Sequence, residues 1–171
     1  LSPWANQRKD EYGRDFEGRL KFVLEVIHRI KEETGKTYPL IVRMSGEEPE
    51  GGNSLEEILE ICRRFEKAGI DAIHVSVGVG SPTKTHDLIP SVTPMRAPAG
   101  CIVHLAQNIK QVVSIPVIAV NKLGDMPFAE KVLKEGKADL IAVGRPLIAD
   151  PYLPLKFAES RLDEIRPCIY C

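Results

Sequence analysis

The feature that most constrains the fold is a regular alternation of short β-branched runs with amphipathic segments. The runs have the length and composition of strands, and they span residues 40–44, 72–76, 116–120 and 140–143. The segments between them have helical apolar spacing, and another precedes the first run, with a stripe of Leu20, Val23, Leu24, Ile27 and Ile30. Strands separated by single helices form βαβ units, which require a parallel sheet with right-handed crossovers. The pattern therefore predicts an α/β fold.

Polar side chains inside the predicted strands bear on the choice between two architectures, an open doubly wound sheet and a (β/α) barrel. No G-x-G-x-x-G motif follows a strand, which weakens the dinucleotide-binding type of open sheet. Arg43 shares one face of its strand with Ile41 and Ser45, and His74 shares a face of the next strand with Ser76. A barrel with its ligand mouth at the strand C-termini explains an arginine near a strand end. Four units predict half of such a barrel.

Local signals set the bounds of the second predicted helix. Ser54 and Glu57 form a capping box at its start, and Gly69 is a typical left-handed stop at its end. Cys62 lies in the apolar stripe of this helix, where we interpret it as an ordinary core residue. Cys101 stands at the head of the next helical segment and receives the same interpretation.

Composition and charge bound the class of partner. Lys and Arg total 23 against 24 Asp and Glu, which gives a net charge of -1. No basic surplus points to nucleic acid or to an anionic membrane, and no apolar run approaches the roughly 20 residues of a membrane span. We expect a cytoplasmic protein that acts on a small-molecule substrate, without a nucleic-acid or membrane partner.

Two loops that follow predicted strands carry candidate binding residues. Gly144 and Arg145 come directly after the last strand, where an open backbone amide and a guanidinium are typical of a phosphate cradle. Asn121 and Lys122 follow the third strand and add a second cationic contact. Arg43 is costly to bury without an anionic or electron-rich partner, so we expect it to face a ligand.

Two alternatives stay open at these loops. Arg43 could instead form a salt bridge with Asp71 or Glu47. The long connection from Gly78 to Pro98 is either a substrate-side lid or a surface excursion.

Cys168 and Cys171 form a C-x-x-C pair at the end of the chain. Two thiolates at this spacing can hold one metal centre, which normally takes four ligands. The residues alone leave three interpretations open: a redox dithiol, half of a zinc site, or part of an iron–sulfur cluster. The four histidines show no mutual metal-ligand spacing, and we assign none of them as a ligand. Because the chain starts at Leu1 without a methionine and stops at this half-site, we expect an internal piece of a longer protein.

A set of short motifs follows one another in order along almost the whole chain. They are Leu1–Pro3, Asn6–Arg8, Asp10–Gly13, Val42–Ser45, His74–Ser76, Pro116–Ala119, Gly136–Asp139, Gly144–Pro151 and Arg166–Cys168. The ordered set resembles the old yellow enzyme family of flavin oxidoreductases. It is most similar to the iron–sulfur branch of that family, the 2,4-dienoyl-CoA reductase, enoate reductase and trimethylamine dehydrogenase type.

This resemblance implies a TIM barrel that binds FMN, with this chain as its C-terminal half, strands 5–8. Residues 1–161 would be the partial barrel, and residues 162–171 the truncated start of the iron–sulfur segment. By position, Arg43 would lie against the N1/C2 carbonyl edge of the flavin, and Lys122, Gly144 and Arg145 would contact the FMN phosphate. Cys168 and Cys171 would be the first two ligands of a [4Fe–4S] cluster.

The resemblance also implies an activity. In such enzymes NAD(P)H reduces the flavin, and the flavin N5 delivers hydride to an activated alkene. The histidine pair and the tyrosine proton donor of the family would precede Leu1, so we assign no catalytic residue to this chain. We therefore expect an inactive fragment of an FMN-dependent ene-reductase of the enoate or 2,4-dienoyl-CoA type.

The alternative function is a non-catalytic phosphate- or nucleotide-binding half-barrel that assembles into a larger scaffold. Under either function, a four-unit half exposes apolar strand edges and faces. We expect these to be covered by self-association or by the missing N-terminal half-barrel.

Overall fold

Four parallel strands form one sheet in which each strand pairs with the next along the chain. The computed structural model describes residues 1–78, 95 and 97–170. In it the strands are β1 (Ile41–Ser45), β2 (Ala72–Ser76), β3 (Val117–Val120) and β4 (Leu140–Ala142), in the order β1-β2-β3-β4. A doubly wound sheet reverses its strand order at a switch point, whereas a barrel places successive strands side by side. The observed order is that of consecutive barrel strands, and each strand starts within one residue of its prediction.

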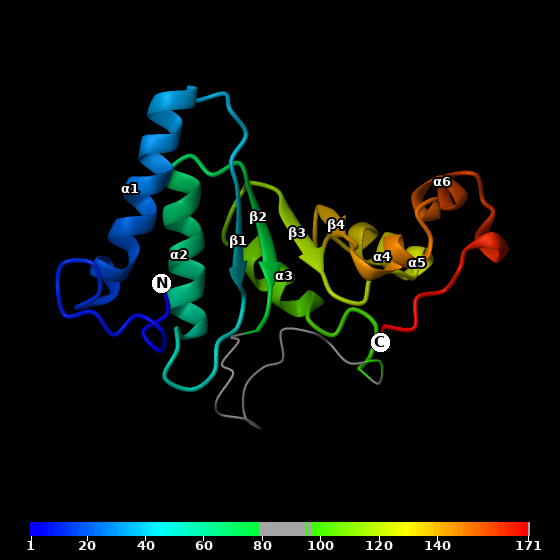
Figure 1. Cartoon of the computed structure of the whole chain (residues 1–171), viewed down its shortest axis with the longest axis horizontal. Helices are drawn as coiled ribbons and strands as arrows, with labels where there is room; N and C mark the ends of the chain where they lie inside the picture. The colour runs from blue at the N-terminus through cyan, green and yellow to red at the C-terminus, as the bar shows by residue number, and fades with distance from the viewer. Residues whose placement is uncertain (79–94, 96, 171) are drawn as a thin grey trace.

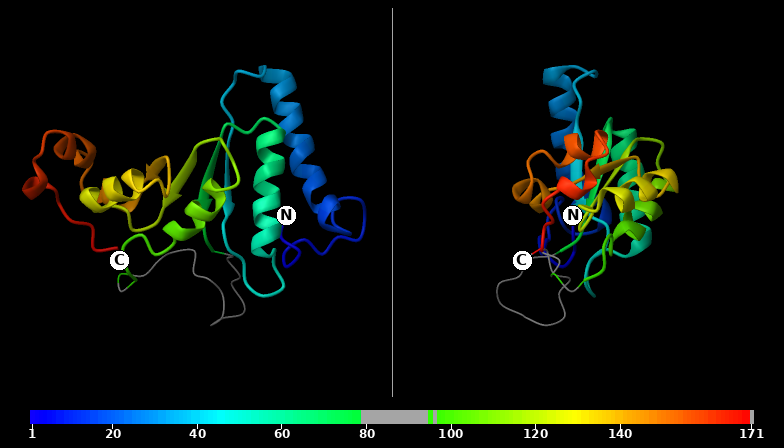
Figure 2. Two further views of the ribbon diagram at one scale, coloured as in Figure 1. Left: turned by 180° about the vertical axis from the view of Figure 1, so that it is seen from behind. Right: turned by 90° about the vertical axis from the view of Figure 1, so that its right-hand side faces the viewer.

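Helices connect the strands and cover one face of the sheet. The connecting helices are α2 (Leu55–Lys67), α3 (Val103–Lys110) and α4 (Met126–Lys134). Helix α1 (Phe16–Thr34) precedes β1, and α5 (Arg145–Ala149), α6 (Leu153–Ala158) and a short 3-10 turn, η1 (Leu162–Glu164), follow β4. The turned view in Figure 2 shows α2, α3 and α4 on the same side of the strands. In Figure 1 the chain runs from α1 at the blue end of the sheet to α6 at the orange end. Within the described residues, no helix has both the length and the apolar character needed to cross a membrane.

The hydrophobic core lies between the sheet and these helices. Ile73, Val75 and Val117 point from the strands into it, where they meet Ile61 and Phe65 of α2 and the apolar side chains of α3. Cys62 is fully buried in the same layer, and burial raises the pKa of its thiol to about 12. The core interpretation of Cys62 is thus confirmed, because a thiol with that pKa stays protonated and unreactive at neutral pH.

The opposite face of the sheet carries the other set of alternating side chains. Arg43 and His74 are direct neighbours on β1 and β2, and Ile41 and Leu140 remain 57% and 51% exposed. Such a face is the interior of a closed barrel, where side chains from alternate strands stack in layers. Arg43 shares this face of β1 with Ile41, as the sequence spacing predicts, while Val42 and Met44 pack against the core on the other face.

The second helix begins and ends as its sequence predicts. Ser54 Oγ accepts from the amide of Glu57, and the Glu57 carboxylate accepts from the amide of Ser54. Gly69 follows the helix with φ 94°, the left-handed conformation that glycine adopts most easily.

We expect Ser54→Ala to lower the free energy of unfolding by about 1 kcal/mol, because the amide of Glu57 loses its side-chain acceptor. Ser54→Thr keeps a hydroxyl at the cap and should recover most of the loss. Denaturant titration followed by circular dichroism measures both variants. Equal stability of the alanine variant and the wild type would contradict a stabilising cap.

Candidate flavin site

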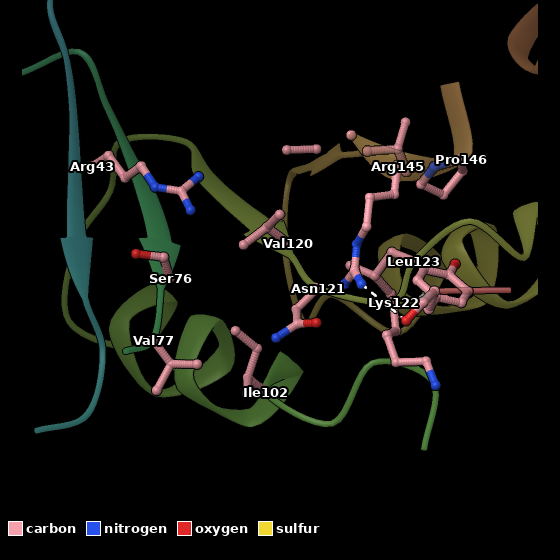
Figure 3. Close-up of a pocket in the computed structure, with 14 residues that line it drawn as sticks. Arg43, Ser76, Val77, Ile102, Val120, Asn121, Lys122, Leu123, Arg145 and Pro146 are labelled. Carbon is pink, nitrogen blue, oxygen red and sulfur yellow. Dashed lines mark hydrogen bonds between the residues drawn. The ribbon is translucent and has the colours of Figure 1, made fainter. Parts of the chain in front are cut away.

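A pocket of about 390 Å³ lies where the C-terminal ends of the strands meet. This volume is within the range of small-molecule and cofactor sites. The pocket is lined by β1, by residues at and after the ends of β2, β3 and β4, by the start of α3 and by the C-terminal segment. The lining residues are Arg43, Ser76, Val77, Ile102, Val120, Asn121, Lys122, Leu123, Ala142, Val143, Gly144, Arg145, Pro146 and Tyr170. Barrel enzymes build their active sites at this end. Every binding residue predicted from the sequence lines the pocket, and Figure 3 shows most of them together.

Arg43 reaches into the pocket from β1 and contacts His74 of β2. Its Nη1 lies 3.1 Å from His74 Nε2. The alternative salt bridge to Asp71 is wrong, because that carboxylate accepts from Lys31 Nζ at 2.7 Å and from the amide of Leu40. Burial and the adjacent Arg43 guanidinium lower the pKa of His74 from 6.5, so the imidazole is neutral at pH 7. A neutral imidazole leaves Arg43 as the positive charge at this end of the pocket.

Replacing Arg43 should raise the pKa of His74. We expect the wild-type His74 to titrate below 6.5 and Arg43→Met to bring its pKa part of the way back, because the positive charge goes while the burial stays. Arg43→Lys keeps a charge and should preserve the low value. The unfolded chain binds this proton more readily than the folded chain, so protonation of His74 should lower the free energy of unfolding as the pH falls below 6.5. An NMR titration of the histidine ring protons measures the shift, and an unchanged pKa in Arg43→Met would contradict the pairing.

Gly144 and Arg145 form the β4 side of the pocket. Gly144 caps the short helix α5, and a Cβ built at this glycine would meet no heavy atom of the described residues within 4 Å, so its backbone is open toward them. The Arg145 guanidinium donates from Nη1 to the carbonyl of Tyr170 at 3.2 Å. In Figure 3, Arg43 and Arg145 point into the pocket from opposite sides. The two guanidiniums thus make the pocket suited to a ligand with an anionic group.

The loop after β3 holds the other two predicted binding residues in a strained backbone. Asn121 and Lys122 have φ values of 89° and 50°, a region that costs of order 1–3 kcal/mol for a residue other than glycine and is concentrated at functional sites. Asn121 lies between the two arginines in Figure 3, and its Oδ1 is buried with no hydrogen-bond donor among the described residues. Such an acceptor is suited to receive a ligand N–H or O–H.

Lys122 turns its ammonium group away from the centre of the pocket. Its Nζ donates to the carbonyl of Met95 at 2.6 Å and to that of Ala97. The phosphate contact predicted for Lys122 stays a prediction, since it requires this side chain to exchange carbonyl partners for the ligand. The predicted lid from Gly78 to Pro98 lies largely outside the described residues.

Cys168 lies beside a second pocket of about 320 Å³, which shares Lys122, Pro146 and Tyr170 with the first. Its half-buried sulfur accepts a hydrogen bond from the amide of Tyr170 at 3.4 Å. Amide hydrogen bonds to the sulfur are also made by metal-bound cysteines. Cys171 lies outside the described residues, and the two-ligand half-site stays a prediction.

A buried carboxylate fixes the segment that leads to Cys168. Asp150 Oδ2 accepts from Lys156 Nζ at 2.7 Å and from the amide of Arg166 at 2.9 Å. The Lys156 ammonium and the amides of Arg166 and Tyr152 hold the pKa of Asp150 below its usual value of 3.8. The hydrogen bond from Arg166 to Asp150 therefore fixes the chain that precedes Cys168 against the C-terminal end of α5.

The residues of the first pocket fit FMN. The cofactor has an anionic phosphate, a polar flavin edge and an apolar ring system. The pocket matches these with two guanidiniums, the open backbone at Gly144, the Asn121 oxygen to which no described residue donates, and the apolar walls formed by Val77, Ile102 and Val120.

The sequence did not reveal two further residues of the site. The sequence pattern gives His74 no role, because its pairing with Arg43 requires the strand register that makes the two residues neighbours. Local sequence patterns do not indicate Tyr170 either, because its partners Gly124 and Arg145 are 46 and 25 residues away.

Comparisons with known proteins place the chain in a family. The NADH:flavin oxidoreductase / NADH oxidase family pattern matches residues 1–164. The NADH oxidase of Thermoanaerobacter brockii is 47% identical over an alignment of 173 positions that covers all of this chain and 26% of that protein. Relatives of this kind are therefore about four times as long as the chain.

Solved structures agree with the sequence match. A 2-naphthoyl-CoA reductase in complex with 2-naphthoyl-CoA superposes with a TM-score of 0.90 at 35% identity, over the whole chain and 26% of that protein. The old yellow enzyme homologue from Zymomonas mobilis gives 0.65 at 25% identity, over 91% of this chain and 41% of its own. The fold is thus the half of a TIM barrel predicted from the sequence, and the chain belongs to the NADH:flavin oxidoreductase / NADH oxidase family, whose cofactor is FMN.

Proposed function

We propose that the chain is the C-terminal half-barrel of a longer, cytoplasmic FMN-dependent oxidoreductase, here called the parent protein, which uses NAD(P)H to reduce activated C=C bonds. The observation that carries the proposal is one pocket at the strand C-termini that Arg43 and Arg145 enter from opposite sides. The likeness to a reductase bound to a conjugated thioester, 2-naphthoyl-CoA, supports a substrate of the enoate or enoyl-CoA class.

Each pocket residue has a binding role in this proposal. The amide of Gly144 and the guanidinium of Arg145 hold the phosphate, while Lys122 adds charge if its ammonium leaves the carbonyls of Met95 and Ala97. Arg43, with the neutral His74 beside it, places positive charge against the flavin edge. When bound, FMN supplies hydride transfer and the iron–sulfur cluster supplies one-electron transfer.

The partner of this half-barrel is the preceding half of the same barrel. The exposed Ile41 and Leu140 lie on the face that a closed barrel buries, and β1 and β4 are the two open edges of the sheet. We propose that these surfaces join the N-terminal units of the parent protein. Isolated, the half-barrel should self-associate through them.

The test is an anaerobic assay of the purified parent protein, loaded with FMN and iron. We expect NADH or NADPH to bleach the flavin absorbance and a 2-enoate or enoyl-CoA to restore it, while the saturated analogue does not. If oxygen re-oxidises the bleached flavin but no alkene does, the proposed alkene substrate is wrong, although the proposal of an oxidoreductase stands. Absence of bleaching would favour the non-catalytic, phosphate-binding scaffold.

A further inference from the structure

Arg43 belongs to a row of side chains that crosses the inner face of the sheet. The strand register places Arg43, His74, Ile118 and Leu140 side by side on the four successive strands. A guanidinium can donate hydrogen bonds but cannot accept them, and the two aliphatic side chains of the row offer no polar atom. Of these four side chains, the imidazole of His74 is therefore the one that can pair with Arg43.

Neither of the two carboxylates considered as partners of Arg43 takes the place of His74. Asp71 pairs with Lys31, and Glu47 lines a pocket that Arg43 does not line. Arg43 Nη1 instead lies 3.1 Å from Nε2 and 3.4 Å from Nδ1 of His74. Because an arginine N–H only donates, the imidazole nitrogen that receives it must be unprotonated. The imidazole thus holds the guanidinium without cancelling its charge, as a carboxylate would do.

His74 does not reach the flavin pocket itself. Of the described residues, those that line the pocket include Arg43 and the next row of side chains toward the strand C-termini, Ser76, Val120 and Ala142, but not His74. An arginine side chain has many rotamers, so a fixed partner decides where its charge lies. His74 therefore acts on a ligand in this pocket through Arg43.

We infer that His74 is a positioning residue that directs the charge of Arg43 toward the flavin edge. The imidazole fixes the direction of the guanidinium and leaves its positive charge in full. Positive charge at this edge stabilises the negative charge that a flavin gains on reduction. The pairing with His74 should therefore raise the reduction potential of bound FMN. This inference rests on the proposed function and gives His74 a part in it.

Substitutions at position 74 separate the direction of the guanidinium from its charge. His74→Leu removes the acceptor, and His74→Gln keeps a neutral acceptor. His74→Glu offers an acceptor that cancels the charge of Arg43, and it tests the inference if the leucine variant does not fold. His104→Leu is the matched control, because His104 is exposed on α3 and lines a different pocket.

The measurement is the reduction potential of FMN bound to the parent protein, for each variant alone and for His74→Leu combined with Arg43→Met. We expect His74→Leu to weaken the binding of reduced relative to oxidised FMN about two- to tenfold, the effect of one lost hydrogen bond, and so to lower the potential. His74→Glu should lower it as well, whereas His74→Gln and His104→Leu should keep the wild-type value. In the Arg43→Met background, His74→Leu should have no further effect, because no guanidinium remains to be positioned.

Two results would overturn this inference alone. One is a wild-type potential in both His74→Leu and His74→Glu while Arg43→Met lowers it. The other is an equal shift from His74→Leu with and without Arg43, since the imidazole would then act on the flavin directly. An unchanged potential in Arg43→Met would also remove Arg43 from the flavin edge, and a parent protein that does not bind FMN would overturn the proposed function as a whole.

Discussion

Arg145→Met in the parent protein is expected to weaken FMN binding about 10- to 100-fold. A hydrogen bond to a charged group contributes about 1.5–3 kcal/mol, and each 1.4 kcal/mol is about tenfold in affinity. Riboflavin lacks the phosphate, so its dissociation constant should change little. The quenching of flavin fluorescence on binding measures both constants.

Arg161→Met is the matched control for that experiment. Arg161 is a surface arginine that pairs with Glu159 and Glu164 and lines neither pocket, and its loss should leave FMN binding unchanged. Equal weakening of FMN and riboflavin in the Arg145 variant would indicate a collapsed pocket and contradict a phosphate contact. Unchanged FMN binding would contradict it too.

Cys168→Ser is expected to remove the cluster from the parent protein. Loss of an outer-shell partner already costs about 10- to 100-fold in metal affinity, and loss of a ligand should cost at least as much. The absorbance of the cluster and the iron and acid-labile sulfide content of the purified protein should fall together, while FMN content persists. Metal analysis of the wild type that finds zinc without sulfide would contradict a cluster and favour a structural zinc site.

Cys101→Ser is the control for the cysteine experiment. This thiol is also half-buried, but it stands at the head of α3 and lines neither pocket. The variant should keep its full iron content. Iron loss in this variant equal to that of Cys168→Ser would show that the effect comes from general destabilisation.

The parts of the fold that depend on neighbours in sequence were predictable. The cap at Ser54, the stop at Gly69 and the alternation within β2 rest on residues a few positions apart, and the structure confirms each of them. Even the placement of Arg43 and Gly144 at one pocket followed, because parallel strands bring their C-terminal ends to the same edge.

Contacts between distant segments were not predictable. The pairing of Arg43 with His74 depends on strand register, and the choice of Lys31 as partner for Asp71 depends on where the C-terminal part of α1 lies relative to the start of β2. The direction of the Lys122 ammonium depends on carbonyl groups more than twenty residues earlier in the chain. These interactions are set by tertiary packing, which local sequence patterns do not encode.

A crystal structure of the parent protein with bound FMN tests the central claim most directly. We predict phosphate oxygens about 2.7–3.2 Å from the amide of Gly144 and the guanidinium of Arg145, with the flavin edge beside Arg43. A flavin whose phosphate contacts none of the loop residues after β3 and β4 would contradict the account.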